Sequence, residues 1–344
     1  MVLSLLVVAI TLHFGIGLTW LLALLVGAIV APTDPVAVIA LFQQLGVPDR
    51  LRTLVEGESI FNDGTGGAAY ELVLAVLLPT LGLAEVSGTT SLLNTPVLAI
   101  VGEVLWLIFG GLLLGFAVGW LVSHLLRRID DRLVVITVTI AVAYGMYLLG
   151  TALHTSGLLS VVGAGLVMGS YGRKNAMSPR TIESADDVWE FIDYLANSLL
   201  FLLLGFELAL TNLVQSFAGI FFGVLGAVIG RVLMIYAFIP LQDVLARWWA
   251  SRTSRRRARL PRPRPVPPAW CPVMALSGLR GALSLALVLG LPEALTQRNL
   301  LTDIVYGIIL VTLLGQGLTL RVLLPRWKDK LIRAEDVKSL PTQV

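Results

Sequence analysis

The chain has 344 residues, of which 56% are hydrophobic and only 14% are charged, and its mean hydropathy is +0.86. Because a soluble domain carries about 25% charged residues, these values exclude a disordered chain, a secreted disulfide-rich scaffold and an ordinary soluble enzyme. The net charge of +3 does not by itself indicate a nucleic-acid partner, since membrane proteins concentrate Lys and Arg in cytoplasmic loops. The composition predicts an all-α polytopic membrane protein that contacts membrane lipid and no nucleic acid.

Apolar runs between charged clusters predict about ten membrane-spanning segments within one transmembrane domain over residues 1–325. The predicted spans cover residues 2–17, 19–45, 53–79, 96–126, 132–152, 156–171, 188–210, 216–241, 269–291 and 303–324. The connections fall into two alternating sets, of which one holds 21 of the 25 Lys and Arg residues and the other holds only Arg298. The positive-inside rule therefore predicts cytoplasmic N- and C-termini.

The two longest connections with basic residues are a loop and a tail. Residues 247–268 are rich in Arg and Pro and predict a cytoplasmic loop, and residues 326–344 predict a cytoplasmic tail. The short loops and short tail are typical of a prokaryotic inner membrane protein. The single cysteine, Cys271, excludes an internal disulfide and a Cys-based metal site.

The predicted span 19–45 contains Ala31-Pro32-Thr33-Asp34-Pro35 near its middle. Pro35 removes a backbone donor and clashes with the preceding turn, so a break is expected here. In a membrane, freed carbonyls are tolerated where they line a cavity, and Asp34 at the break can meet both a cation and a helix N-terminus. A kinked helix with a capping Asp is the alternative.

The predicted span 53–79 also contains ionisable and polar residues within an apolar segment. Its sequence there is Glu56-Gly57-Glu58-Ser59-Ile60-Phe61-Asn62-Asp63-Gly64. Ser59 and Asp63 are four residues apart and share a helix face, and Asn62 precedes Asp63. Oxygen atoms from a carboxylate, a hydroxyl and a freed backbone carbonyl are the donors that hard cations prefer. This pattern of donors is typical of a site for a hard monovalent cation.

Three later spans carry further ionisable or polar residues. Asp193 and Asn197 are four residues apart on one helix face, and Arg231 interrupts an apolar run, so all three are candidate accessory residues as well as candidate packing residues. Arg280 lies between two glycines of an apolar segment and requires a buried counter-charge. Glu58 is the expected partner and Glu56 the alternative. Such a pair is structural, because a guanidinium stays protonated.

Four motifs of this sequence are similar to motifs of a known family. The chain resembles the monovalent cation:proton antiporters of the NhaP/NHE sodium/proton exchanger type over about residues 1–325, through TDPVAV at 33–38, VPDRLRTLVEGESIFNDG at 47–64, DYLANSLLFLLLGFEL at 193–208 and GLRGALSLAL at 278–287. The resemblance implies an inverted-repeat fold with two crossing discontinuous helices, near 33–35 and 278–284. It also implies a homodimer. The family's first few spans would precede residue 1, so an N-terminally truncated form of the fold is expected.

The resemblance also implies a mechanism and residue roles. Asp63 would bind either the cation or the proton, with Asp34, the Thr33 backbone and Ser59 lining the site. Asn62 matches the electroneutral members, which exchange one proton for one sodium. Glu58 and Arg280 match an ion pair of the family.

The expected function is therefore secondary transport without a cofactor rather than enzymatic catalysis. Sodium is the expected cation, with lithium or potassium as alternatives. Three other functions stay open: a transport-inactive fragment or membrane subunit, a cation channel, and an intramembrane aspartyl protease.

Overall fold

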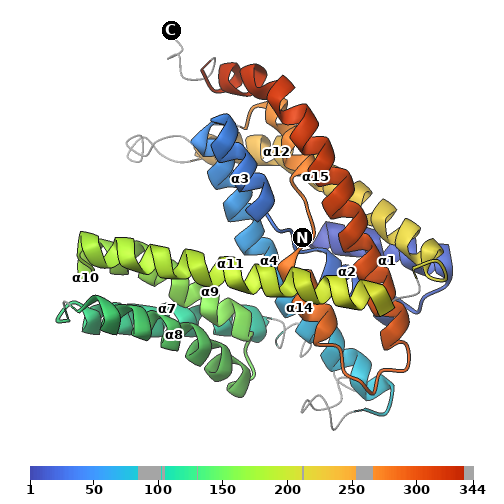
Figure 1. The fold of residues 1–344 in the computed structure, drawn as a ribbon, viewed down its shortest axis with the longest axis horizontal. Helices are drawn as coiled ribbons and strands as arrows, with labels where there is room; N and C mark the ends of the chain where they lie inside the picture. Colours follow the sequence, from blue (N-terminus) through green and yellow to red (C-terminus); the bar gives the residue numbers. More distant parts are fainter. Residues whose placement is uncertain (84–101, 103–104, 130, 211–212, 253–265, 337–344) are drawn as a thin grey trace. The chain divides into compact units, whose positions relative to one another are not determined.

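The computed structural model describes residues 1–83, 102, 105–129, 131–210, 213–252 and 266–336 (Figure 1). Every regular element within these ranges is helical, as the composition predicts. The chain divides into two compact units, although the sequence pattern indicates one transmembrane domain. The first unit comprises Met1–Asn62, Asn212–Ser284 and Asn299–Val344, and the second comprises Asp63–Thr211 and Leu285–Arg298.

The first unit is built around helices that pack with their backbones close together. Its helices are α1 (Val2–Ile16), α2 (Trp20–Val30), α3 (Val36–Leu45), the first part of α4 (Asp49–Thr80), α12 (Phe217–Arg252), η5 (Pro268–Trp270), α13 (Cys271–Leu276), the start of α14 (Ala282–Leu289) and α15 (Arg298–Asp336). Helix α1 packs against α2 and α12. A Cβ atom added to Gly226 of α12 would lie 2.9 Å from the Cα atom of Val8 on α1. Glycine at this crossing therefore permits the close approach that membrane helices use.

Two interruptions divide helical segments of the first unit. Helix α2 ends at Val30 and α3 begins at Val36, so residues 31–35 leave the helical conformation where Pro35 predicts a break. Helix α13 ends at Leu276 and α14 begins at Ala282, which leaves residues 277–281 as the second interruption. The predicted spans 19–45 and 269–291 are thus each made of two shorter helices.

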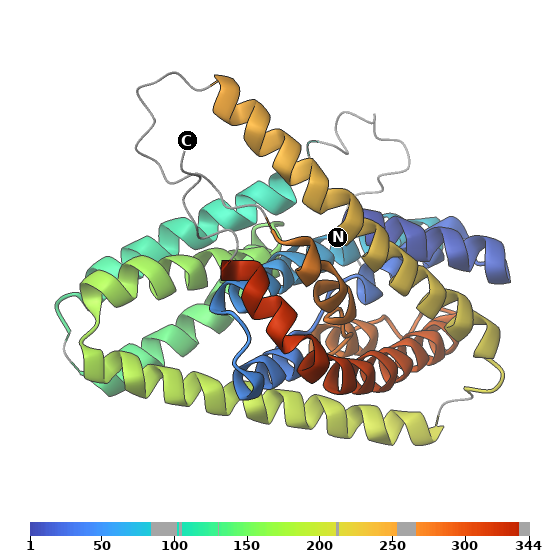
Figure 2. The same cartoon turned by 90° about the horizontal axis from the view of Figure 1, so that it is seen from above.

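The second unit contains a bundle of long helices (Figure 2). Its elements are the remainder of α4, the π-helical turn η2 (Trp106–Gly110), α7 (Gly111–Leu126), α8 (Arg132–Ala152), α9 (Gly157–Val167), the π-helical turn η3 (Met168–Gly172), α10 (Arg173–Ala176), α11 (Pro179–Leu210) and the end of α14. Helix α9 packs against α7 and α8, and α8 also contacts α11, drawn in yellow-green. Asp131 caps α8 by accepting hydrogen bonds from the Leu133 and Val134 backbone N–H groups at 2.8 and 3.3 Å.

Small residues form the contact between α7 and α9. A Cβ atom on Gly115 would lie 2.8 Å from the backbone nitrogen of Ala164, and one on Gly119 would lie 2.9 Å from the Cα atom of the same residue. A Cβ atom on Gly163 would lie 2.8 Å from the carbonyl oxygen of Leu112. The two helices therefore pack backbone against backbone at these positions, with no room for a side chain at the three glycines.

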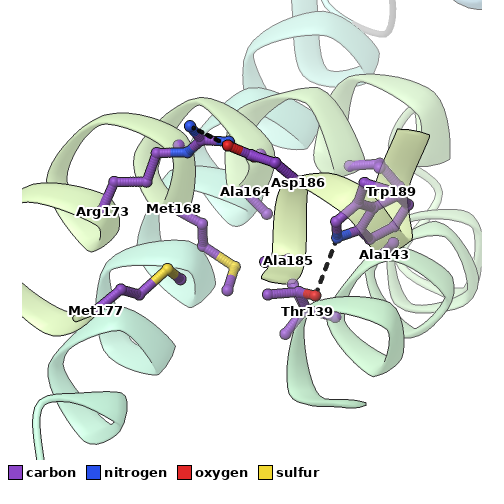
Figure 3. Close-up of a pocket in the computed structure, with 13 residues that line it drawn as sticks. Thr139, Ala143, Ala164, Met168, Arg173, Met177, Ala185, Asp186 and Trp189 are labelled. Atoms are coloured by element: carbon purple, nitrogen blue, oxygen red, sulfur yellow. Dashed lines mark hydrogen bonds and ion pairs between the residues drawn. The ribbon is translucent and has the colours of Figure 1, made fainter. Parts of the chain in front are cut away.

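A cavity of about 330 Å³ lies among α8, α9, η3, α10 and α11 of the second unit (Figure 3). Arg173 forms an ion pair with Asp186 beside it, and the Trp189 indole Nε1–H donates to the Thr139 hydroxyl at 3.1 Å. Most of the other lining residues are apolar, including Met168. These two polar contacts link α10 and α8 to α11.

Five described helices are long and apolar enough to cross a membrane: Trp106–Leu126, Arg132–Ala152, Pro179–Glu207, Phe217–Ala237 and Arg298–Ala334. Helices α1, α2 and α3 are apolar but shorter. Helix α4 covers the predicted span 53–79 and is not among the five, since it carries the charged residues of the second motif.

Two predicted polar segments are partly helical. The segment predicted as a loop over 247–268 begins inside α12, which continues to Arg252, and residues 253–265 lie outside the described residues. The predicted tail 326–344 begins inside α15, which continues to Asp336, and residues 337–344 are likewise outside. A cluster of basic residues is excluded from hydrocarbon, but without Gly or Pro it does not end a helix.

The backbone contact between α7 and α9 gives a first testable prediction. Gly115→Ala should lower the thermal stability of the detergent-purified protein, because the new methyl group meets the α9 backbone, which cannot move aside as a side chain can. We expect a loss of about 1–3 kcal/mol, the usual cost of overpacking. Gly145→Ala on α8 is the matched control, because nothing lies within 4 Å of its added Cβ atom. Equal melting temperatures for the two variants would contradict the packing described here.

Candidate ion-binding site

The two helix interruptions of the first unit contact each other. The backbone N–H of Asp34 in the first interruption donates to the carbonyl oxygen of Leu279 in the second at 2.8 Å. Next to this contact, the Ser284 hydroxyl of α14 donates to the Ile29 carbonyl near the end of α2 at 2.7 Å. These hydrogen bonds join segments about 250 residues apart in sequence and satisfy polar groups that would otherwise be unpaired in an apolar environment.

The Asp34 carboxylate bridges the N-terminal ends of two helices. Its Oδ1 atom accepts a hydrogen bond from the backbone N–H of Val36, the first residue of α3, at 3.0 Å. Its Oδ2 atom accepts from the backbone N–H of Ala282, the first residue of α14, at 3.3 Å. Both N–H groups belong to helix starts that have no partner within their own helices, so one side chain satisfies a donor from each helix.

A buried polar cluster connects the first interruption with α4. The Ser59 hydroxyl donates to the Thr33 carbonyl oxygen, and the Asn62 side-chain amide donates to the Thr33 hydroxyl at 3.4 Å. Ser59, Thr33 and Asn62 are only 3%, 5% and 6% exposed. The Thr33 carbonyl and the Ser59 hydroxyl oxygen each keep a lone pair, so both can also coordinate a cation.

Asp63 follows this cluster along α4 and belongs to the second unit. It is half-buried, and it lies one helical turn after Ser59. Because α4 is continuous from Asp49 to Thr80, the predicted shared face of Ser59 and Asp63 is present in the structure.

The prediction that Glu58 pairs with Arg280 is wrong. Glu58 forms a two-pronged ion pair with Arg231 of α12, in which Nη1 donates to Oε1 and Nη2 donates to Oε2 at 3.1 Å. Arg231 Nη2 also donates to the carbonyl oxygen of Met274 at 2.9 Å. Arg280, the expected partner, instead donates from Nη1 to the carbonyl oxygen of Gly278 within its own interruption, at 3.0 Å.

Both guanidinium groups are deeply buried, with Arg231 3% and Arg280 1% exposed. Either could neutralise Glu58 by charge alone, and Arg280 lies within electrostatic range of both Glu58 and Arg231. The geometry favours Arg231, because only its fork reaches both carboxylate oxygens. Arg231 is therefore the ion-pair partner of Glu58, and its solitary place in an apolar helix was the signal for a buried counter-charge.

A cavity of about 530 Å³ in the first unit reaches the polar residues of α4. Glu58 and Asn62 line it from α4, together with Ile235 of α12 and Met274 of α13. The cavity gives Asn62, at the edge of the buried cluster, an open space beside it.

The remaining candidates form a local pair on α11. The Asn197 side-chain amide donates to Asp193 Oδ1 at 3.0 Å, across one helical turn on an exposed face. Sequence reasoning missed three contributions to the site: the N–H of Ala282, the carbonyl of Leu279 and the hydroxyl of Ser284. Two are backbone groups that any residue type could supply, whereas a serine in an apolar helix was a usable signal.

The chain is similar in sequence to known membrane transporters. The family model described as "Sodium/hydrogen exchanger, transmembrane" matches residues 1–326. The chain is 35% identical over 328 residues to the Na(+)/H(+) antiporter ApNhaP of Aphanothece halophytica, covering 94% of this chain and 57% of that protein. It is 34% identical over 313 residues to the Na(+)/H(+) antiporter NhaP of Pseudomonas aeruginosa, covering 91% of this chain and 68% of that protein.

A solved structure shows the same fold. The sodium proton antiporter MjNhaP1 from Methanocaldococcus jannaschii superposes with a TM-score of 0.66 at 19% sequence identity, covering 92% of this chain and 76% of that one. The chain spans a little over half the length of ApNhaP. Taken with the family match over residues 1–326, these relatives show that the chain is a multi-pass membrane protein belonging to the sodium/hydrogen exchanger family, a family of transporters rather than enzymes.

Proposed function

We propose that this chain exchanges a monovalent cation, Na⁺ in the first place and Li⁺ or K⁺ as alternatives, for H⁺ across the membrane. The observation that carries the proposal is the meeting of two helix interruptions at Asp34, beside the buried cluster of Thr33, Ser59 and Asn62. Broken helices that present carbonyl oxygens and a carboxylate are the usual ion sites of secondary transporters. The antiporter names of the relatives support the same activity.

In the proposed mechanism Asp63 carries either the cation or the proton. Asp34, the Thr33 carbonyl and the Ser59 hydroxyl supply further oxygen ligands for the cation. The two loads exclude each other because a protonated carboxylate does not attract a cation. Competition at a single site, exposed alternately to each side, couples the two movements.

We further propose that exchange is electroneutral, with one proton for one cation. Asn62 is neutral and its amide donates to Thr33, which leaves Asp63 as the residue at this position of α4 that changes charge. The expected fold, with crossing discontinuous helices of two inverted repeats, is supported by the hydrogen bond between Asp34 and Leu279.

The setting of the protein is also a proposal. The bacterial relatives support a prokaryotic inner membrane, and the clustering of Lys and Arg in alternate connections supports cytoplasmic termini. Contact with membrane lipid follows from the apolar helices, and a homodimer is proposed by analogy with the family.

The central prediction concerns Asp63. In proteoliposomes an imposed Na⁺ gradient should drive proton movement with the native chain, and Asp63→Asn should reduce this movement to the level of empty vesicles, since an amide cannot exchange a proton for a cation. Asp329→Asn, an exposed position on α15, is the matched control and should retain exchange. Cation current without proton counter-movement would instead indicate a channel, and the absence of any movement would indicate a transport-inactive subunit.

Competition predicts a specific dependence on pH. As the pH falls, Asp63 becomes protonated and the apparent KM for Na⁺ should rise, approaching about tenfold per pH unit, while the maximal rate is unchanged. Initial rates measured over a series of Na⁺ concentrations at several pH values test this. A maximal rate that falls with pH at constant KM would mean that proton and cation use separate sites.

The Glu58–Arg231 pair gives a prediction about stability. Glu58→Gln and Arg231→Met should each destabilise the protein by about 3–5 kcal/mol, because each leaves one buried charge without its partner. The double variant should be less destabilised than the sum of the two single variants. Unfolding measured in detergent gives the coupling energy.

The matched control is a second double-mutant cycle, in which Glu58→Gln is combined with Arg280→Met instead of Arg231→Met. The Glu58–Arg280 coupling energy should be the smaller of the two, since Arg280 donates to Gly278 rather than to Glu58. The reverse order would restore Arg280 as the partner of Glu58.

A further inference from the structure

Gly281 is the last residue of the second interruption and lies directly against the Asp34 carboxylate. A Cβ atom added to Gly281 would lie 2.6 Å from Asp34 Cγ and closer still to its Cβ and Oδ2 atoms. We propose that Gly281 is a positioning residue, whose missing side chain leaves the space in which Asp34 reaches the N-terminus of α14, and that it thereby sets cation affinity. The affinity part of this inference rests on the proposed function.

Backbone conformation does not explain the glycine. Among the described glycines, positive φ angles occur at Gly17, Gly46 and Gly82, where only glycine is unstrained. Gly281 has no such angle, so an alanine could adopt its backbone conformation. The requirement at this position is therefore for space.

Helix packing does not explain it either. At the α7–α9 crossing, an added Cβ atom on Gly115 meets backbone atoms of the neighbouring helix. At Gly281 the three nearest atoms all belong to the side chain of one residue, Asp34. The space left by the absence of a side chain at Gly281 is thus occupied by a carboxylate of the proposed ion site.

An added methyl group at Gly281 displaces Asp34 against the contacts that hold it in place. The Asp34 backbone is held by the hydrogen bond from its N–H to the Leu279 carbonyl and by the fixed φ of the following Pro35. The added atom would also lie directly against the Asp34 Cβ atom, which side-chain rotation does not move. The two interruptions must therefore shift apart, and Asp34 Oδ2 then moves away from the Ala282 N–H that it accepts from. A carboxylate moved by about 1 Å is a poorer ligand, and such displacements at a functional site cost up to about 10²-fold.

Gly278 offers a neighbouring comparison. Its added Cβ atom would lie 2.7 Å from Arg231 Nε and 3.0 Å from Arg231 Cδ, with no atom of Asp34 among its three nearest neighbours. The two glycines that flank Arg280 thus border different groups, Gly278 the ion pair and Gly281 the carboxylate. Gly278→Ala should disturb the stability of the protein without moving Asp34.

The test compares Gly281→Ala with Gly278→Ala and with Gly315→Ala on α15, whose added Cβ atom meets nothing within 4 Å. The first readout is amide hydrogen exchange of the peptide covering residues 277–289 in the detergent-purified protein. Gly281→Ala should accelerate exchange at the start of α14, because the Ala282 N–H loses its acceptor, and Gly315→Ala should not. Unchanged protection in Gly281→Ala would overturn the positioning role, whatever the transport result.

The second readout is transport in proteoliposomes. Gly281→Ala should raise the KM for Na⁺ by roughly 10-fold or more, with a smaller change in maximal rate. A merely structural defect would lower the maximal rate and leave KM unchanged, which would count against the inference. The native chain could fail to transport cations while Gly281→Ala still accelerates amide hydrogen exchange at the start of α14. In that case the proposed function would be contradicted and the positioning role of Gly281 would stand.

Discussion

The first unit depends on one carboxylate that two helices share. An apolar surrounding has no water to satisfy the free N–H groups at the start of a helix, and each unpaired group costs free energy. The two interruptions create two such helix starts, at Val36 and Ala282, and Asp34 accepts a hydrogen bond from both. The Asp34 carboxylate that the proposed ion site requires thus also satisfies the free N–H groups of the two broken helices. A substitution of Asp34 would therefore affect both the proposed site and the fold.

The buried charges of this unit have different structural roles. Asp34 is stabilised by helix ends, whereas Glu58 is neutralised by the guanidinium fork of Arg231. Arg280 bonds to a carbonyl of its own interruption, where the peptide turns without helical partners. A guanidinium that never loses its proton suits a structural position, and a carboxylate that can lose or gain one suits exchange. The proposed mechanism accordingly assigns the ions to the carboxylates at 34 and 63 and gives the two guanidinium groups structural positions.

The sequence predicts local features of this chain well and long-range partners poorly. Pro35 and Asp34 indicate the first interruption, and four-residue spacing indicates the common face of Ser59 and Asp63, because both depend on a few neighbouring residues. The partner of Glu58 depends on which of two arginines has the reach and angle, which spacing along the chain does not encode. Helices α12 and α15 continue beyond the predicted spans 216–241 and 303–324, since charge marks where hydrocarbon ends and not where a helix ends.

The second bond of Arg231 has a consequence for how this region can vary. Its fork holds Glu58 by a side chain, but it holds residue 274 by a backbone carbonyl that every amino acid possesses. A substitution at either position 58 or position 231 thus leaves a buried charge without its partner. The bond to residue 274 needs no particular side chain there, so the identity of that residue does not reveal the contact, and what Met274 contributes as a side chain is its packing in the buried cluster with Trp270.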